Sequence, residues 1–201
     1  MAPGVIIYAK GVGRWQPNAR ERLVRAGLEL FLERGYDSVT VAEIAERAGL
    51  TKRTFFRHLA DKREVLFLGE DVLSRLMADA IADAPESATP MAAIAAALEA
   101  AATAFPLERR DIALRRQTVI ASNSNLQERE SLKRATLTAA MAEALRHRGV
   151  AEPTATLAGE VGSLAFRGAF SRWADPACKK QFAELTREAL EELRAATAAL
   201  A

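Results

Sequence analysis

The sequence is poor in the residues on which disulfides, metal sites and membrane spans depend. It has one cysteine, Cys178, so neither an intrachain disulfide nor a cysteine-based metal site can form. No run approaches the roughly 18 consecutive apolar residues that a membrane helix needs. The apolar patch near the N-terminus is too short for a signal peptide. We therefore expect a cytoplasmic protein without a membrane partner.

Signals for catalysis are also scarce. The two histidines, His58 and His147, do not form a metal-ligand pair such as HExxH. Cys178 has no histidine near it in the sequence to activate it as a nucleophile, and glycine-rich phosphate loops are absent. We expect neither an enzyme nor a protein that requires a metal or a cofactor.

What the sequence does contain favours helices. Hydrophobic residues make up 50% of the chain, alanine is abundant, and no strand pattern of useful length occurs. The net charge of +2 is unevenly distributed, because residues 10–63 hold twelve Lys/Arg against seven Asp/Glu while the remainder is acidic by three. A basic N-terminal quarter is typical of polyanion binding, although a difference of this size also occurs by chance.

Capping residues, glycines and prolines divide the chain into about nine helices of an all-α protein. We expect a flexible arm over 1–16, a helix-turn-helix domain over 17–62, and a ligand-binding and dimerisation domain over 63–201. Capping boxes begin the second and fourth helices, at Thr40 with Glu43 and at Asp61 with Glu64. The expected helices cover about 17–34, 40–48, 51–59, 61–82, 91–103, 107–122, 126–148, 154–173 and 179–200.

The second and third helices are joined by a tight turn over 48–51, which is the layout of a helix-turn-helix. Gly49 permits the positive φ that such a turn often needs. In the third helix, Lys52 and Arg53 can donate to phosphates or guanines, and Thr54 can contact a phosphate or a thymine methyl group. A short basic helix of this kind can equally be a solvated surface helix, so spacing alone leaves both interpretations open.

The stretch from Arg20 to Leu68 resembles the N-terminal domain of TetR-type repressors. The matching segments are AGLELF over 26–31, ERGY over 33–36, TVAEIAERAG over 40–49 and TFFRH over 54–58, followed by Asp61 and Lys62. The resemblance implies a DNA-binding transcriptional regulator, most often a repressor that binds double-stranded DNA at a palindromic operator as a homodimer. Release by a small-molecule effector is the family's usual response.

The resemblance also implies which residues contact DNA. It makes the third helix the recognition helix, and it gives phosphate contacts to the Thr40 hydroxyl and to Lys62. Phe56 stands where the family usually has a tyrosine that bonds a phosphate, and Leu59 stands where phenylalanine is usual. The expected DNA-contacting set is Thr40, Thr51, Lys52, Arg53, Thr54, Phe56, Arg57, His58 and Lys62.

The C-terminal helices resemble the family only in number and length. The resemblance implies dimerisation through the last two helices, with an interface of Gly159, Gly162, Phe182, Leu185, Ala189 and Leu193. Packing within the chain's own core explains the same stripe of residues.

For ligand binding we expect a mainly apolar pocket, a lipophilic effector, and lining residues Phe105, Arg115, Met141, Phe166, Phe170 and Trp173. Ordinary core packing is an open alternative for each apolar residue of this set, and a solvated helix face is the open alternative for Arg115. A second function class also stays open, namely an all-helical small-molecule-binding protein or enzyme without an operator. The cations around the glycine turn argue against this class, because such a protein would not need them.

Overall fold

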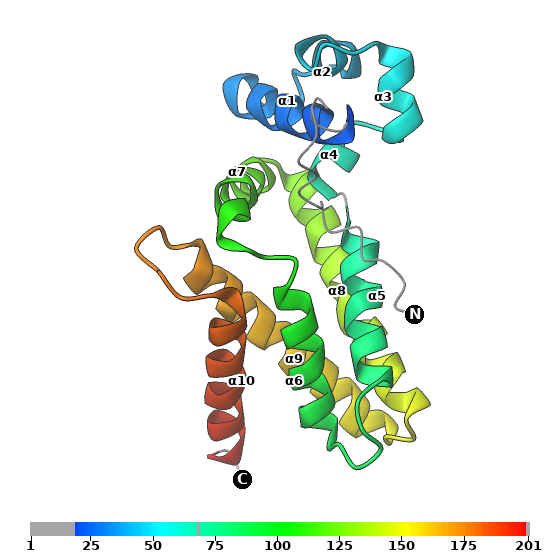
Figure 1. Ribbon diagram of the computed structural model, residues 1–201, viewed down its shortest axis with the longest axis vertical. Coiled ribbons are helices and arrows are strands. Elements are labelled where there is room, and N and C mark those ends of the chain that lie inside the picture. Colours follow the sequence, from blue (N-terminus) through cyan, green and yellow to red (C-terminus); the bar gives the residue numbers. More distant parts are fainter. Residues whose placement is uncertain (1–18, 68, 200–201) are drawn as a thin grey trace, which may run out of the picture. The chain divides into compact units, whose positions relative to one another are not determined.

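The computed structural model describes residues 19–67 and 69–199, and every regular element in these ranges is a helix (Figure 1). The all-α prediction is confirmed. The chain divides into two compact units, Met1–Leu68 and Gly69–Ala201. The arm expected over 1–16 lies outside the described residues.

The first unit contains α1 (Ala19–Arg34), α2 (Val41–Arg47), α3 (Lys52–His58) and the single turn α4 (Glu64–Phe67). Its core consists of side chains at most 2% exposed from all four helices, including Leu23, Leu30, Ile44, Phe55 and Leu66. Helix α4 approaches α1 closely at Gly27, where an added Cβ would lie 2.8 Å from Val65 Cγ1. Glycine at this position is therefore required by the packing of α4 on α1.

The first unit ends after the predicted boundary at residue 62, because α4 packs into its core. Val65, Leu66 and Phe67 are at most 3% exposed, and the unit ends at Leu68. The helix expected over 61–82 is divided, because Gly69 has a φ of +85° and separates α4 from α5 (Glu70–Ala82). The described residues accordingly form ten α-helices and one 3-10 turn instead of about nine helices.

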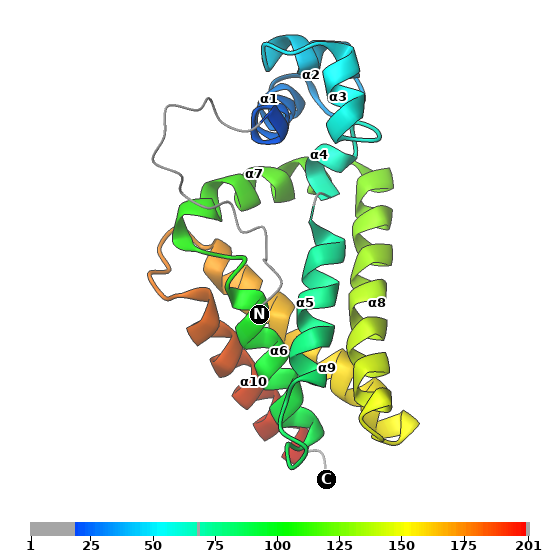
Figure 2. The same cartoon turned by 45° about the vertical axis from the view of Figure 1, so that its right-hand side comes forward.

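The second unit is a bundle of α5, α6 (Pro90–Ala102), α7 (Arg110–Ala121), α8 (Ser124–His147), α9 (Glu152–Ala174) and α10 (Phe182–Ala198), with the 3-10 turn η1 (Leu107–Arg109) before α7. Helix α5 lies along α8, and α10 lies beside α9 and α6 (Figure 2). Three alanines of α6, Ala93, Ala97 and Ala101, are completely buried. Their small side chains allow neighbouring helices to approach closely.

No single helix among the described residues is long and apolar enough to cross a membrane. One bent pair, Pro90–Ala102 with Leu107–Ala121, meets that criterion by length and composition alone.

The faces expected to form the dimer interface are used inside the chain. A Cβ on Gly159 would lie 3.0 Å from the Thr138 carbonyl oxygen of α8, and one on Gly162 would lie 3.0 Å from Ile94 Cγ2 of α6. On α10 the predicted stripe belongs to the unit's core, with Phe182, Leu185 and Ala189 at most 4% exposed and Leu193 half-buried against them. This prediction is corrected, because small residues and an apolar stripe serve a neighbouring helix of the same chain equally well.

Candidate nucleic-acid interface and aromatic cluster

Helix α2 begins with a complete capping box, as the sequence predicted. The Thr40 hydroxyl oxygen accepts from the Glu43 amide at 3.3 Å, while the Thr40 amide donates to Glu43 Oε2 at 2.8 Å. The Thr40 hydroxyl also donates to Glu43 Oε2 at 2.7 Å. These bonds from Thr40, together with Arg34, hold the pKa of Glu43 below its ordinary value. A phosphate bond from the Thr40 hydroxyl would require it to turn away from Glu43.

The turn between α2 and α3 is stabilised by hydrogen bonds from a side chain of α1. Gly49 has a φ of +64°, and the Leu50 amide returns to the Ala45 carbonyl at 2.8 Å. The Arg22 guanidinium donates to the carbonyl oxygens of Ala48 and Gly49, and a Cβ on Gly49 would lie 2.7 Å from Arg22 Nη2. The sequence did not single out Arg22, because no local pattern links it to a turn 26 residues away.

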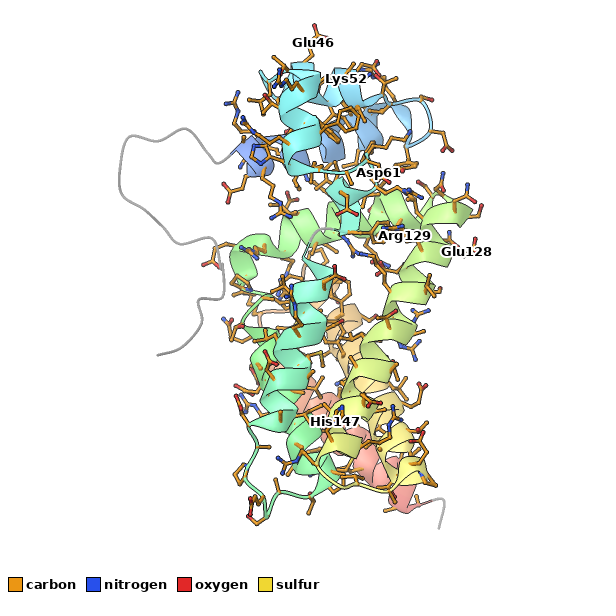
Figure 3. All side chains as sticks on the ribbon, turned by 90° about the vertical axis from the view of Figure 1, so that its right-hand side faces the viewer. Glu46, Lys52, Asp61, Glu128, Arg129 and His147 are labelled. Carbon is orange, nitrogen blue, oxygen red and sulfur yellow. The ribbon has the colours of Figure 1, made fainter. Side chains whose placement is uncertain are left out.

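Helix α3 buries one face and exposes the other. Phe55 is completely buried and Leu59 is 3% exposed, so both side chains point into the first unit. The opposite face carries Lys52, Arg53, Arg57 and the half-exposed Phe56. Lys52 begins the helix (Figure 3), and its ammonium lies 6.0 Å from the Phe56 ring centroid. Phe56 thus offers apolar surface within a basic face.

Thr51 caps the N-terminus of α3. Its hydroxyl oxygen accepts from the Thr54 amide at 3.1 Å, and the two hydroxyl oxygens of Thr51 and Thr54 are hydrogen-bonded at 3.0 Å. Thr51 is exposed and Thr54 is half-buried. The two hydroxyls lie at the helix N-terminus, where backbone amides favour an anion.

The cations of α3 differ from three other cations of the first unit in having no carboxylate partner. Three arginines pair with carboxylates of the same unit: Arg34 with Glu43, Arg47 with Glu33, and Arg63 with Asp61. No described carboxylate forms an ion pair with Lys52, Arg53 or Arg57. Three exposed, unpaired positive charges on one short helix are available to an external polyanion.

Lys62 has a structural role that the sequence did not reveal. Its ammonium donates to the carbonyl oxygens of Tyr36 at 2.8 Å, Val39 at 3.0 Å and Asp37 at 3.3 Å. The same nitrogen lies 4.3 Å from the Tyr36 ring centroid. These three bonds engage all three ammonium donors and stabilise the segment between α1 and α2. A phosphate contact from Lys62 stays a prediction, and it would compete with these bonds.

His58 is less accessible than its neighbours on the exposed face of α3. Its Nε2 is buried and has no hydrogen-bond partner among the described residues, and the side chain as a whole is half-buried. A DNA contact from His58 stays a prediction, and Nε2 would reach a base edge only if the side chain turned outward. The exposed DNA-contact candidates on this helix are therefore Thr51, Lys52, Arg53, Phe56 and Arg57.

In the second unit, four of the residues predicted to line a ligand pocket lie together. The Phe105 ring centroid is 5.4 Å from that of Phe166, 6.0 Å from that of Phe170 and 5.8 Å from that of Trp173. Phe182, which the sequence placed at a dimer interface, stacks on Phe105 at 4.6 Å. We call these five rings the aromatic cluster.

The other two predicted pocket residues lie elsewhere. Arg115 is 48% exposed and pairs with Asp111 at 2.8 Å on the same helix, so its prediction is corrected to a solvated ion pair. Met141 is completely buried, with its sulfur 3.2 Å from the position of a Cβ on Gly162, and it fills the core. An open depression of about 500 Å³ on α7 is lined by none of the predicted pocket residues but by Leu114, Gln117, Thr118, Ala121 and Ser122.

Comparison with known proteins identifies the first unit. Residues 23–67 match the family described as "Bacterial regulatory proteins, tetR family". This segment is therefore similar to the N-terminal domain of that family. The segment that matches this family contains the whole of α2, the glycine turn and α3, and it ends with α4.

Curated relatives match this chain over a part of its length. The HTH-type transcriptional regulator TcmR of Streptomyces glaucescens is 38% identical over 81 residues, which is 40% of this chain and 36% of TcmR. The uncharacterized HTH-type transcriptional regulator Rv2250c of Mycobacterium tuberculosis is 34% identical over 64 residues, 32% of each chain. The chain thus spans about a third of the length of the curated relatives it matches. Both are named as regulators and not as enzymes.

Solved structures extend the likeness to both units. Thermus thermophilus FadR, a TetR-family transcriptional repressor in complex with lauroyl-CoA, is 25% identical and has a TM-score of 0.54, over 87% of this chain and 92% of FadR. Bacillus subtilis FadR in complex with stearoyl-CoA is 17% identical with a TM-score of 0.56, over 86% of this chain and 96% of that one, and it shows the shared fold.

Proposed function

We propose that the chain is a transcriptional repressor that binds a palindromic operator as a homodimer and leaves it when a small lipophilic effector binds. The observation that carries this proposal is the basic face of α3, where Lys52, Arg53 and Arg57 are exposed without a carboxylate partner among the described residues. This helix lies within the family match and follows a glycine turn.

In the proposed complex α3 enters the major groove and α2 crosses the DNA backbone. Lys52 and Arg53, at the helix N-terminus, donate to base edges and adjacent phosphates, and Arg57, one turn further, donates to a phosphate. Phe56 contacts a thymine methyl group or a sugar, since it lacks the hydroxyl of the family's usual tyrosine. Thr51 supports a phosphate at the start of α3.

Homodimerisation is proposed through an exposed face of α9. Leu157 is 62% exposed and Leu164 is 44% exposed, and they stand seven residues apart with the half-buried Val161 between them. Residues at this spacing share one face of a helix, and exposed leucines gain free energy when a second copy covers them. A two-fold dimer would present two α3 helices to successive major grooves, about 34 Å apart along the DNA.

The effector is proposed to bind in the second unit. The aromatic cluster supports a mainly apolar ligand, and two structural neighbours are described in complex with lauroyl-CoA and stearoyl-CoA. An effector favours release only to the extent that it binds the released conformation more tightly than the DNA-bound one.

Selection of bound DNA from a random pool tests the operator proposal. With the full-length chain we expect a palindromic consensus with two half-sites. Arg53→Ala should bind more sequences at the contacted position, because one base contact costs about 1–3 kcal/mol of discrimination. Arg134→Ala, which removes an exposed cation from α8, is the matched control and should select the parent consensus.

Failure to enrich any DNA sequence would favour the second function class, a helical ligand-binding protein without an operator. Enrichment of a single, non-repeated half-site would retain DNA binding and contradict the dimer.

A further inference from the structure

Arg110, the first residue of α7, holds an unusual arrangement of hydrogen-bond donors. Its Nη1 donates to the Cys178 carbonyl oxygen at 2.6 Å, and its guanidinium carbon lies 5.3 Å from the Trp173 ring centroid. Its Nε and Nη2 are buried and have no hydrogen-bond partner among the described residues. No described carboxylate pairs with this guanidinium.

The two unpartnered nitrogens lie on the same edge of the guanidinium group. The N–H bonds of Nε and Nη2 are parallel, and their spacing matches the two oxygens of a carboxylate. Nη1 is outside this edge, so its bond to Cys178 fixes the group while leaving the two-donor edge unpartnered. Arg110 is half-buried as a residue, but two buried donors of a cation are costly unless something accepts from them.

The tryptophan near Arg110 holds a third unpartnered donor. Trp173 is completely buried, and its indole Nε1 has no hydrogen-bond partner among residues 19–67 and 69–199. The Arg110 guanidinium carbon lies 5.3 Å from the centroid of the same ring, and Trp173 belongs to the aromatic cluster. Phe105, Phe166 and Phe170 are only half-buried, which gives an apolar ligand access to the cluster.

We propose that the Nε–Nη2 edge of Arg110, assisted by Trp173 Nε1, binds the carboxylate of an effector whose apolar body occupies the aromatic cluster. The ligand class is a monocarboxylic acid with an aliphatic or aromatic body. One cation balances the single charge of a carboxylate, whereas a phosphate monoester carries a charge of about −1.5 to −2 at pH 7. The role of this ligand in operator release rests on the proposed function, but its binding does not.

The test uses the full chain with Trp15→Phe, which leaves Trp173 as the single tryptophan. Dodecanoate, dodecanol and lauroyl-CoA are titrated without DNA, with indole fluorescence and calorimetry as readouts, and 2-naphthoate is the aromatic probe. Dodecanol keeps the apolar body and lacks the carboxylate. We expect dodecanoate, 2-naphthoate or both acids to bind. If dodecanoate binds, its affinity should exceed that of dodecanol by at least about tenfold.

Two variants link this preference to Arg110. Arg110→Gln should remove the preference for acid over alcohol, and Arg110→Lys, which keeps the charge without the two-donor edge, should recover only part of it. Arg115→Gln removes an exposed cation from the same helix and should leave the preference unchanged. If Arg110→Gln loses its helical circular dichroism, the comparison of Arg110→Lys with the parent decides the question.

Equal affinity for acid and alcohol in the parent, or an unchanged preference in the folded Arg110 variants, would overturn the proposal. So would binding of lauroyl-CoA alone, since its thioester has no carboxylate, and so would the absence of binding by both acids. Binding of an acid together with failure of the DNA selection would refute the repressor function and retain the ligand site. A palindromic consensus without acid binding would retain the repressor function and refute the ligand site.

Discussion

Replacement of Lys62 by methionine separates the role that the structure gives this residue from the role that the family resemblance implies. Methionine keeps most of the length and volume of the side chain and removes the ammonium. In the structure this substitution deletes three hydrogen bonds to the carbonyls of Tyr36, Asp37 and Val39 and a cation–π contact with Tyr36. If Lys62 bound a phosphate instead, it would delete one contact to DNA.

The magnitude follows from those contacts. A hydrogen bond to a charged group contributes about 1.5–3 kcal/mol, but the three bonds share one half-buried nitrogen and do not add fully. The cation–π contact adds about 0.5–1 kcal/mol. We expect Lys62→Met to lower the unfolding free energy of the first unit by about 2–4 kcal/mol. Because the ammonium is occupied within the chain, the salt dependence of DNA binding should keep its slope.

Hydrogen-exchange mass spectrometry of peptides from residues 19–67 measures the stability, and DNA binding at several salt concentrations measures the slope. Lys52→Met is the matched control, because Lys52 is exposed and has no ion pair among the described residues. It should leave stability within about 0.5 kcal/mol and reduce the logarithmic salt slope by about 0.9. A Lys62→Met protein of parental stability with a reduced slope would refute the structural role.

Three further changes test other parts of the structure. Gly27→Ala should destabilise the first unit by about 1–3 kcal/mol, because its Cβ would lie 2.8 Å from Val65 Cγ1; denaturant unfolding measures this, and unchanged stability would contradict the close packing of α4. The bonds from Thr40 depress the pKa of Glu43 in the folded chain. The ionised Glu43 should therefore add its full contribution to the free energy of unfolding above the ordinary pKa of 4.5, and this contribution should be lost as the pH falls through the folded pKa. Glu43→Gln should weaken the loss of unfolding free energy between pH 7 and pH 3, measured by denaturant unfolding. The same loss in the parent and the variant would show that another group causes it. Leu164→Glu should yield monomers in analytical ultracentrifugation, whereas a persistent dimer would exclude this face of α9.

The recognition unit could be predicted in detail because its signals are local. The hydroxyl of Thr40 and the carboxylate of Glu43 meet within one helical turn, so the capping box is present wherever the helix begins. Gly49 fixes the turn through its own φ, and Phe55 is buried because of its place in a short amphipathic helix. The resemblance over Arg20 to Leu68 added the order of these features, which the match over residues 23–67 bears out.

The remaining assignments depended on partners that are distant in the sequence. Gly159 and Gly162 permit close approach to any helix, and only the packed unit shows that α8 and α6 are those helices. Arg115 and Arg110 are both arginines of α7, yet Arg115 pairs with Asp111 in solvent, whereas Arg110 is half-buried near Trp173. Composition and periodicity do not distinguish these two environments.

The sequence by itself determined the all-α class, most helix ends and the helix-turn-helix, because capping, glycine conformation and apolar periodicity act over a few residues. Tertiary structure decided what the charged groups do. Lys62 meets a carbonyl 26 residues away, and Arg110 meets one 68 residues away. A cation's function depends on which acceptors surround it, and chain folding, not local pattern, brings such acceptors together or leaves a donor such as Arg110 Nε without one.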